Sequence, residues 1–348
     1  MQTISFNFRE FFMRKRVFIT GVGGFLGHHL AVRMNKLGWE VAGNDTFIGG
    51  EEDNVPDFVD FTLCDCCDFD SMQKAIKGSS LVYHCAATAH EGLSVFSPSF
   101  ITKNIFEASV TTFSASISTG VNKIVFCTSM ARYGDQKAPF TEDLNPSPVD
   151  PYGIAKVASE EVLKVMSKVH GIEWNIAVPH NIVGENQKYD DPFRNVMSIM
   201  LNRNLQGKPS MIYGDGTQTR CFSYVGDCVN CLERMGTDKS ISQEIINIGP
   251  DEEHITINQL AELCSNETGF NGKPIYFPKG RPQEVKHATC SSDKARLLLN
   301  YKTSTSLKQS VKKTANWIRR KGVKPFKYHL PLEIVNDKTP KTWKDKLI

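Results

Sequence analysis

A glycine-rich turn near the N-terminus constrains the fold more than any other feature of this sequence. The apolar, β-branched run 16–20 leads into Gly21, Gly24 and Gly27, and 25–37 then has the apolar spacing of a helix. Glycine permits a tight turn and lets backbone N–H groups and the helix N-terminus approach a pyrophosphate. The spacing G-x-x-G-x-x-G at a strand–helix junction therefore predicts the start of a dinucleotide-binding domain.

Short apolar runs alternate with helix-length segments through the first half of the chain, and the rhythm is lost after Pro179. This pattern predicts an α/β protein with a Rossmann-type, doubly wound parallel sheet and a smaller, interleaved α/β lobe. Further strands are expected at 39–43, 59–63, 81–85, 123–128 and 174–178, and further helices at about 194–204, 257–268 and 292–299. The expected division is 15–179 with a returning segment at about 222–250 for the first domain, 180–221 and 251–321 for the second lobe, and 322–348 for a basic tail.

An acidic residue follows the glycine turn at a suitable distance. Asp45 ends the second predicted strand, 18 residues after Gly27, where a carboxylate accepts hydrogen bonds from the adenosine ribose hydroxyls. A carboxylate there repels a 2′-phosphate, so NAD is expected rather than NADP. The alternative is that Asp45 only begins a turn.

Two Tyr-x-x-x-Lys patterns occur, Tyr152/Lys156 and Tyr133/Lys137. The first opens a predicted helix after Val-Asp-Pro, so that the lysine lies one turn from the tyrosine on the same face. The second lies in a loop, where nothing fixes the pair. The helix is predicted from apolar residues that recur every three to four positions, namely Ile154, Ala158, Val162, Val165 and Val169.

The first pair has the chemistry of a proton-transfer site. Tyrosine, with an ordinary pKa near 10, is a poor base at neutral pH, but the ammonium group of Lys156 and a positive nicotinamide ring would both favour the phenolate of Tyr152. Ser129, directly after a predicted strand, could hydrogen-bond the reacting hydroxyl oxygen.

Charge and cysteine usage narrow the class of protein. The segment 302–348 carries 13 Lys/Arg and 3 Asp/Glu, yet has no nucleic-acid motif. We therefore expect a solvated helix plus tail, with a nucleic-acid-binding arm as the alternative. Neither a signal peptide nor a membrane span is expected, because the opening stretch has no continuous apolar core and no apolar run reaches about 18 residues. The C-x-x-C of Cys228/Cys231 has no second pair at a spacing that would suit zinc, so both thiols are expected as buried small hydrophobes. Free thiols agree with a cytoplasmic location.

Taken together, these motifs resemble the extended short-chain dehydrogenase/reductase family, in its nucleotide-sugar epimerase/dehydratase branch. The resemblance covers about 15–321. Its motifs, in chain order, are the glycine turn, Asp45, Cys85-Ala86-Ala87, Asn104, 128–134 (TSMARYG), Tyr152/Lys156, 179–184 (PHNIVG), 213–227 (YGDGTQTRCFSYVGD), 247–249 (NIG) and 280–287 (GRPQEVKH).

The resemblance implies a site for NAD and a site for a UDP-sugar, with no metal. The implied catalytic residues are Ser129, Tyr152 and Lys156. The implied cofactor-binding residues are Gly21, Gly24, Phe25, Leu26, Gly27, Asp45, Asp65, Cys66, Cys85, Ala86, Ala87, Asn104, Tyr152 and Lys156. The implied substrate-binding residues are Thr88, Ser129, Asn181, Asn195, Tyr213, Arg220, Arg281, Glu284 and Ala288.

Within that site the resemblance implies particular roles. Asp65 would contact adenine, Asn104 would help to position the nicotinamide end, and Tyr213 would lie near the nucleotide base. The diphosphate would be held by Asn181, Asn195, Arg220 and Arg281. His180 and Cys221 depart from the family pattern, which has Phe before the Asn and Asp after the Arg.

The residues after Ser129 distinguish the reactions of this branch. Dehydratases place Asp-Glu there and sugar-acid decarboxylases a Glu, and 3,5-epimerases a Cys, whereas this chain has Met130-Ala131. The resemblance therefore implies an NAD-dependent 4-epimerase, in polysaccharide biosynthesis and as a homodimer. The alternatives are a 4-dehydrogenase or 4-keto reductase with the same triad, and a catalytically silent NAD-binding regulator. In 4-epimerases a small residue at the position of Ala288 admits a 2-acetamido group.

Overall fold

Seven parallel strands form the central sheet of the computed structural model, which describes residues 15–348. The strand order is β11-β6-β5-β4-β1-β2-β3, so the chain runs outward from β1 and then crosses back to β4. In such sheets the ligand crevice lies at this reversal, outside the carboxyl ends of the strands. The strands are β1 (Arg16–Thr20), β2 (Glu40–Asp45), β3 (Asp60–Leu63), β4 (Leu81–His84), β5 (Lys123–Cys127), β6 (Glu173–Pro179) and β11 (Glu244–Ile248).

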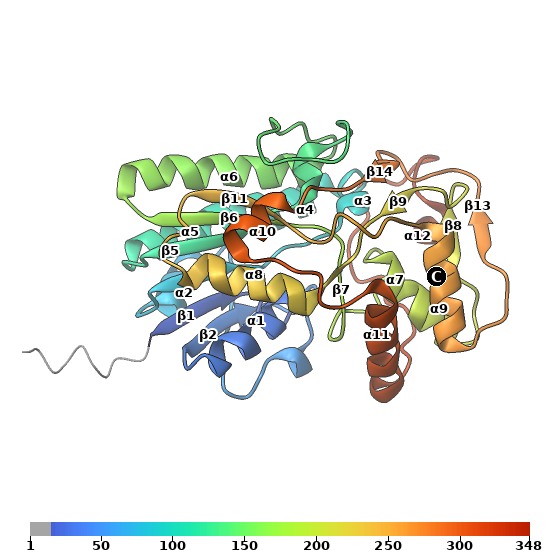
Figure 1. Cartoon of the computed structure of the whole chain (residues 1–348), viewed down its shortest axis with the longest axis horizontal. Helices are drawn as coiled ribbons and strands as arrows, with labels where there is room; N and C mark the ends of the chain where they lie inside the picture. The colour runs from blue at the N-terminus through green and yellow to red at the C-terminus, as the bar shows by residue number, and fades with distance from the viewer. Residues whose placement is uncertain (1–14) are drawn as a thin grey trace, which may run out of the picture.

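Helices cover both faces of the sheet, as Figure 1 shows. Side chains alternate along a strand, so β1 sends Val17 and Ile19 to one face and Phe18 to the other. One face packs against α1 (Phe25–Lys36), α8 (Val225–Thr237) and α10 (Asp293–Leu299). The opposite face packs against α2 (Phe69–Ile76), α5 (Ala108–Ser118) and α6 (Pro151–His170). The predicted Rossmann-type fold is confirmed.

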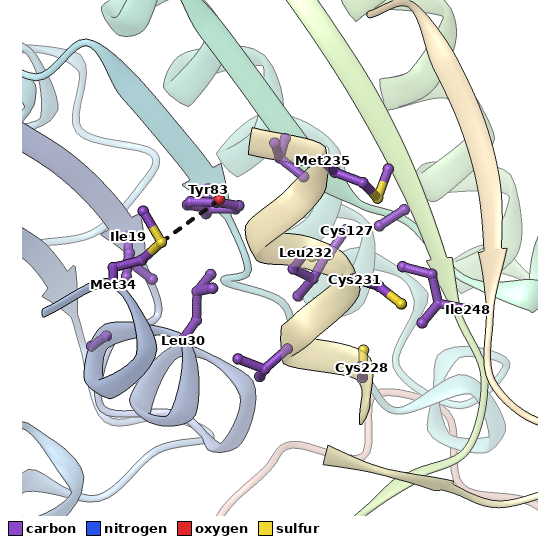
Figure 2. Close-up of a cluster of buried hydrophobic side chains, with 14 of the residues drawn as sticks. Ile19, Leu30, Met34, Tyr83, Cys127, Cys228, Cys231, Leu232, Met235 and Ile248 are labelled. Atoms are coloured by element: carbon purple, nitrogen blue, oxygen red, sulfur yellow. Dashed lines mark hydrogen bonds between the residues drawn. The ribbon is translucent and has the colours of Figure 1, made fainter. Parts of the chain in front are cut away.

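Helix α8 presents the C-x-x-C thiols to the core. Figure 2 shows Cys228 and Cys231 beside Leu232 and Met235, facing the sheet. Both cysteines are buried and neither is in a disulfide, which confirms the expectation of small buried hydrophobes. In the described part of the chain, no group of three His, Cys, Asp or Glu side chains could hold a metal ion.

The second lobe is built from short strand pairs and three packed helices. Its apolar core joins α7 (Val196–Leu205), α9 (Ile257–Thr268) and α11 (Leu307–Lys321). Helix α10 was placed in this lobe by sequence, but its Ala295 and Leu299 pack against the Rossmann core instead. The strand pairs are β7 (Ile182–Val183) with β10 (Ser223–Tyr224), β8 (Met211–Tyr213) with β13 (Ile275–Phe277), and β9 (Thr219–Arg220) with both β12 (Ile255–Thr256) and β14 (His287–Ala288).

Shorter helices complete the connections between these elements. The stretch 98–118 is continuous and changes from α4 (Pro98–Thr102) to a π-helical turn (Lys103–Glu107) and then to α5. The remaining short helices are the 3-10 helices Glu52–Asn54 and Met130–Tyr133, α3 (Glu91–Ser94) and α12 (Lys341–Lys344).

Helix α6 is present where its apolar spacing predicted it, but the apolar residues at that spacing lie largely on its outer side. Ile154, Val165 and Val169 are 55, 58 and 71% exposed. The buried face instead carries Tyr152 and Lys156, followed by Ser159, Glu160, Leu163 and Ser167. The helix is therefore oriented by its polar site residues, and its apolar side faces outward.

The expectation of a solvated C-terminal tail is also wrong. Leu330 and Trp343 are 7 and 3% exposed and belong to an apolar cluster that includes Phe96, Tyr152 and Phe193. The physical reason is that the basic side chains of this segment point outward while its few large apolar side chains fill a gap between the two lobes. The structure contains no helix in 15–348 that is long and apolar enough to cross a membrane. The stretch 1–14, where the signal-peptide expectation falls, lies outside the described residues.

Candidate active site

A cavity of about 480 Å³ lies at the carboxyl ends of the strands, between the two lobes. Every residue predicted for cofactor binding, substrate binding or catalysis lines it, which brings together side chains separated by up to 267 positions, from Gly21 to Ala288. Their individual roles stay predictions.

The glycine turn allows an unusually close approach of backbone to backbone. A Cβ on Gly27 would lie 2.1 Å from the carbonyl oxygen of Gly21, and Gly21 itself has φ +70° and would bring a Cβ within 2.9 Å of Ala86 Cα. Only glycine is compatible with both contacts. The turn thereby keeps the N-terminus of α1 open toward the cavity, where a pyrophosphate would accept its N–H groups.

Asp45 closes this part of the cavity. Its carboxylate accepts hydrogen bonds from the backbone N–H of Gly23 (3.0 Å) and Phe47 (2.7 Å), and burial raises its pKa above the ordinary value. A buried carboxylate at the end of β2 suits neutral ribose hydroxyls and disfavours a phosphate. The residues present therefore fit NAD.

The predicted triad comes from α6 and from the turn that follows β5. Tyr152 and Lys156 are 6 and 2% exposed, and the ammonium group of Lys156 lies 5.9 Å from the centroid of the Tyr152 ring. Lys156 Nζ also donates to the carbonyl oxygen of Cys127 (2.8 Å), at the end of β5. Ser129, the N-cap of the 3-10 helix Met130–Tyr133, hydrogen-bonds the Tyr152 hydroxyl.

Burial dominates the electrostatics of this triad. It raises the pKa of Tyr152 above its ordinary value, although the hydrogen bond with Ser129 acts in the opposite direction. Burial also lowers the pKa of Lys156 to about 8. The protein alone therefore does not favour the phenolate, contrary to what the Tyr-Lys pair suggested, because desolvation opposes the charged form.

A buried ion pair behind the triad was missed by sequence reasoning. Glu160, one turn beyond Lys156, accepts from Thr128 Oγ1 (2.5 Å) and from Arg132 Nε (3.2 Å) and Nη2 (3.0 Å). Arg132 and Glu160 are 2 and 0% exposed. Because Thr128 and Arg132 flank Ser129, this carboxylate fixes the serine-bearing turn to the helix that carries Tyr152.

Two arginines and a glutamate lie together in the part of the cavity predicted to bind substrate. Arg281 Nη2 donates to Glu284 Oε1 (2.8 Å), and Arg220 Nη2 lies 3.7 Å from the same oxygen. One carboxylate thus holds two guanidinium groups side by side, as a diphosphate site requires. Ala288 pairs with Arg220 in the β14–β9 register and is 8% exposed.

The two predicted asparagines are held by neighbouring backbone. Asn181 Nδ2 donates to the carbonyl oxygen of Cys221 (2.9 Å), and Asn195 caps α7 by accepting from Met197 N (3.0 Å). In the π-helical turn, Asn104 Nδ2 donates to the carbonyl oxygen of Phe100 (2.8 Å). All three side chains line the cavity from fixed positions.

Glu91 is a further cavity residue that no motif indicated. Its side chain is accessible because it lines the open cavity. Protein atoms nevertheless surround the cavity, and the resulting desolvation raises the pKa of Glu91 to about 7. Asp150 also raises this pKa, whereas Arg220 and Arg281 lower it. The short helix that carries Glu91 has no periodicity that a sequence pattern could detect.

The second Tyr-x-x-x-Lys tyrosine and the two residues that depart from the family pattern all lie outside the cavity. Tyr133 is fully buried, where it stacks on Phe140 and donates to Asn247 Oδ1 (2.8 Å), so it belongs to the core rather than to a loose loop. His180 contacts the carbonyl oxygen of Pro250 (3.0 Å). Neither His180 nor Cys221 lines the cavity, so these departures from the family pattern remove no cavity contact.

Comparisons with known proteins agree with this geometry. The model of the NAD-dependent epimerase/dehydratase family matches residues 17–249. An inferred UDP-glucose 4-epimerase of Methanocaldococcus jannaschii is 31% identical over 308 residues, covering 87% of this chain and 98% of that protein. A UDP-N-acetyl-α-D-glucosaminuronate decarboxylase of Bacillus cytotoxicus is 29% identical over 328 residues, covering 88% of this chain and 98% of that protein.

Solved structures agree as well. The UDP-glucose 4-epimerase of Thermotoga maritima, solved with UDP-glucose, has a TM-score of 0.82 at 28% identity and covers 88% of this chain and 99% of its own. The UDP-glucose 4-epimerase of Thermus thermophilus, solved with NAD, has a TM-score of 0.81 at 26% identity and covers 87% of this chain and 99% of its own. Fold and site thus define an extended short-chain dehydrogenase/reductase. The chain belongs to the NAD-dependent epimerase/dehydratase family, and the predicted cofactor, NAD, is confirmed by this membership.

Proposed function

We propose that this protein is a 4-epimerase of a UDP-sugar that works through a 4-keto intermediate. The observation that carries the proposal is the Ser129/Tyr152/Lys156 triad beside paired arginines, with Met130 and Ala131 where a dehydratase or decarboxylase would place its acid. The relatives include both epimerases and decarboxylases, so the residue chemistry, rather than similarity, selects between them.

Each residue of the site has a separate proposed role. Arg220 and Arg281 hold the diphosphate, which leaves the hexose between them and the triad. Tyr152 accepts the proton of the C4 hydroxyl while a hydride leaves C4, and Ser129 hydrogen-bonds O4 throughout. Lys156, fixed by the carbonyl oxygen of Cys127, holds the nicotinamide ribose. Bound NAD supplies the hydride acceptor and donor. The 4-keto sugar then turns within the cavity, a hydride would return to the opposite face of C4, and Tyr152 gives its proton back to O4.

The small residue at position 288 favours 2-acetamido sugars. Ala288 lines the cavity next to Arg220, and a methyl side chain there leaves room for an N-acetyl group at C2. We therefore propose UDP-GlcNAc and UDP-GalNAc as substrates, alongside or in preference to UDP-Glc and UDP-Gal.

The test is conversion of UDP-GlcNAc by the purified protein without added cofactor, followed by chromatography of both epimers. Epimerisation without net NADH change supports the proposal. Stoichiometric NADH formation or consumption would instead establish the 4-dehydrogenase or 4-keto reductase. Retention of NAD with no turnover of any UDP-sugar would establish a regulator.

The outward apolar face of α6 supports the expected homodimer. Ile154, Val165 and Val169 would be covered by the same helix of a second copy, since exposed apolar patches of this kind mark interfaces. Sedimentation of the wild type and of Val165→Asp tests this, because the charge should release monomers. The ten free cysteines fit the proposed cytoplasmic location in a pathway of polysaccharide biosynthesis.

A further inference from the structure

The C-terminal segment 323–348 contributes Trp343 and Ile348 to the cavity lining and contacts both lobes. On the Rossmann side, Lys324 Nζ pairs with Glu51 (2.9 Å) and Glu333 accepts from the backbone N–H of Phe100 (2.7 Å). On the opposite side, Trp343 Nε1 donates to the carbonyl oxygen of Pro192 (3.2 Å). This segment lies beyond the region matched by the family model, which ends at residue 249.

Helix α12, in this segment, reaches a predicted substrate-binding residue. The hydroxyl of Thr342, which is fully buried, hydrogen-bonds the hydroxyl of Tyr213. The guanidinium carbon of Arg281 lies over the Tyr213 ring, 5.8 Å from the centroid of that ring. The same ring packs against Phe277. Thr342 therefore fixes the far end of an aromatic ring whose face supports one of the diphosphate-binding arginines.

Two further residues hold Thr342 in place. Tyr328 donates its hydroxyl to the carbonyl oxygen of Thr342 (2.9 Å) and accepts from the backbone N–H of Ile348 (3.0 Å). Trp343 packs at 5.2 Å from Phe193 and points its ring edge at Gly92, where an added Cβ would lie 3.5 Å from Trp343 Cη2. Trp343 and Ile348 themselves line the cavity.

We infer that α12 and the residues up to Ile348 form a wall of the nucleotide site, and that Thr342 is a positioning residue for substrate, acting through Tyr213. The inference rests on the proposed function, because it takes the ligand beside Tyr213 and Arg281 to be a uridine diphosphate. Thr342 does not touch the reacting carbon, so its loss weakens nucleotide binding and leaves the hydride and proton steps intact.

The test uses UDP as the probe and isothermal titration calorimetry on the full-length, NAD-loaded protein. Thr342→Val keeps the side-chain shape and removes the hydroxyl, and we expect the Kd for UDP to rise about 3- to 10-fold, the usual effect of one hydrogen bond. KM should rise in parallel while kcat stays within about twofold. Thr342→Ser keeps the hydroxyl, so its Kd for UDP and its KM should stay at the wild-type values. Lys344→Ala, on the exposed side of α12, is the matched control and should change neither.

The double variant Thr342→Val/Tyr213→Phe makes the test specific. If Thr342 acts through Tyr213, the double variant binds UDP no more weakly than Tyr213→Phe alone. Equal UDP affinity of wild type and Thr342→Val would overturn the inference, and so would a lowered melting temperature with an unchanged Kd, which indicates a merely structural role. Failure of the wild type to bind UDP at all would overturn the proposed function itself.

Discussion

Removing Glu160 tests whether the buried ion pair holds Ser129, the serine of the proposed triad, in place. Glu160→Ala leaves Arg132 charged and almost fully buried and deprives Thr128 of its acceptor. Breaking one partner of a buried pair costs about 3–5 kcal/mol, because the remaining charge is left uncompensated. We therefore expect a clear fall in the urea midpoint. Because Ser129 lies between Thr128 and Arg132, we also expect kcat to fall, on the order of 100-fold for a displacement of about 1 Å.

The matched control removes the charge on both sides. Arg132→Met/Glu160→Leu should recover most of the stability, since apolar replacements of buried pairs are often neutral. Both variants are measured by circular dichroism in urea at the same NAD loading, because a ligand bound to the folded state raises the midpoint. If Glu160→Ala unfolds at the wild-type urea concentration, the pair does not stabilise this turn and the argument fails.

Four further predictions address the site directly. Tyr152→Phe should lower kcat at least ~100-fold with NAD still bound, whereas Tyr133→Phe should have a milder effect; equal activities would refute the choice of base. Asp45→Ala should narrow the preference for NAD over NADP, as calorimetry with each nucleotide would show. Ala288→Tyr should abolish turnover of acetamido sugars and spare plain ones, and equal losses would show that the residue does not gate the pocket. Glu91, with a pKa raised to about 7, ionises between pH 6 and 8, so UDP should bind more weakly as pH rises; the trend should vanish in Glu91→Gln.

Buried parallel strands could be predicted from sequence because both of their faces are covered. They form continuous apolar runs that need no partner information. The second strand illustrates the accuracy, since 39–43 was expected and Glu40–Asp45 is observed. The glycine turn was equally visible, because its geometry depends on local backbone crowding around Gly27.

The apolar pattern of α6 predicted the helix but not which of its faces is buried. Periodicity reports that one face of a helix is apolar but not what lies against it. In α6 the inward face is occupied by Tyr152, Lys156 and Glu160, whose polar groups are satisfied by β5 and the Ser129 turn. The inward face of a helix can therefore be polar where neighbouring elements satisfy its hydrogen bonds.

The C-terminal segment escaped prediction because its charge and its contacts are carried by different residues. Its Lys and Arg side chains dominate the composition, but they lie on the surface of the segment that faces water. Its position is set by Leu330, Thr342 and Trp343, spaced too irregularly to suggest a helix or strand, and each needs a partner more than 100 residues away, such as Tyr213 or Pro192. Contacts of this kind exist only once both lobes have formed.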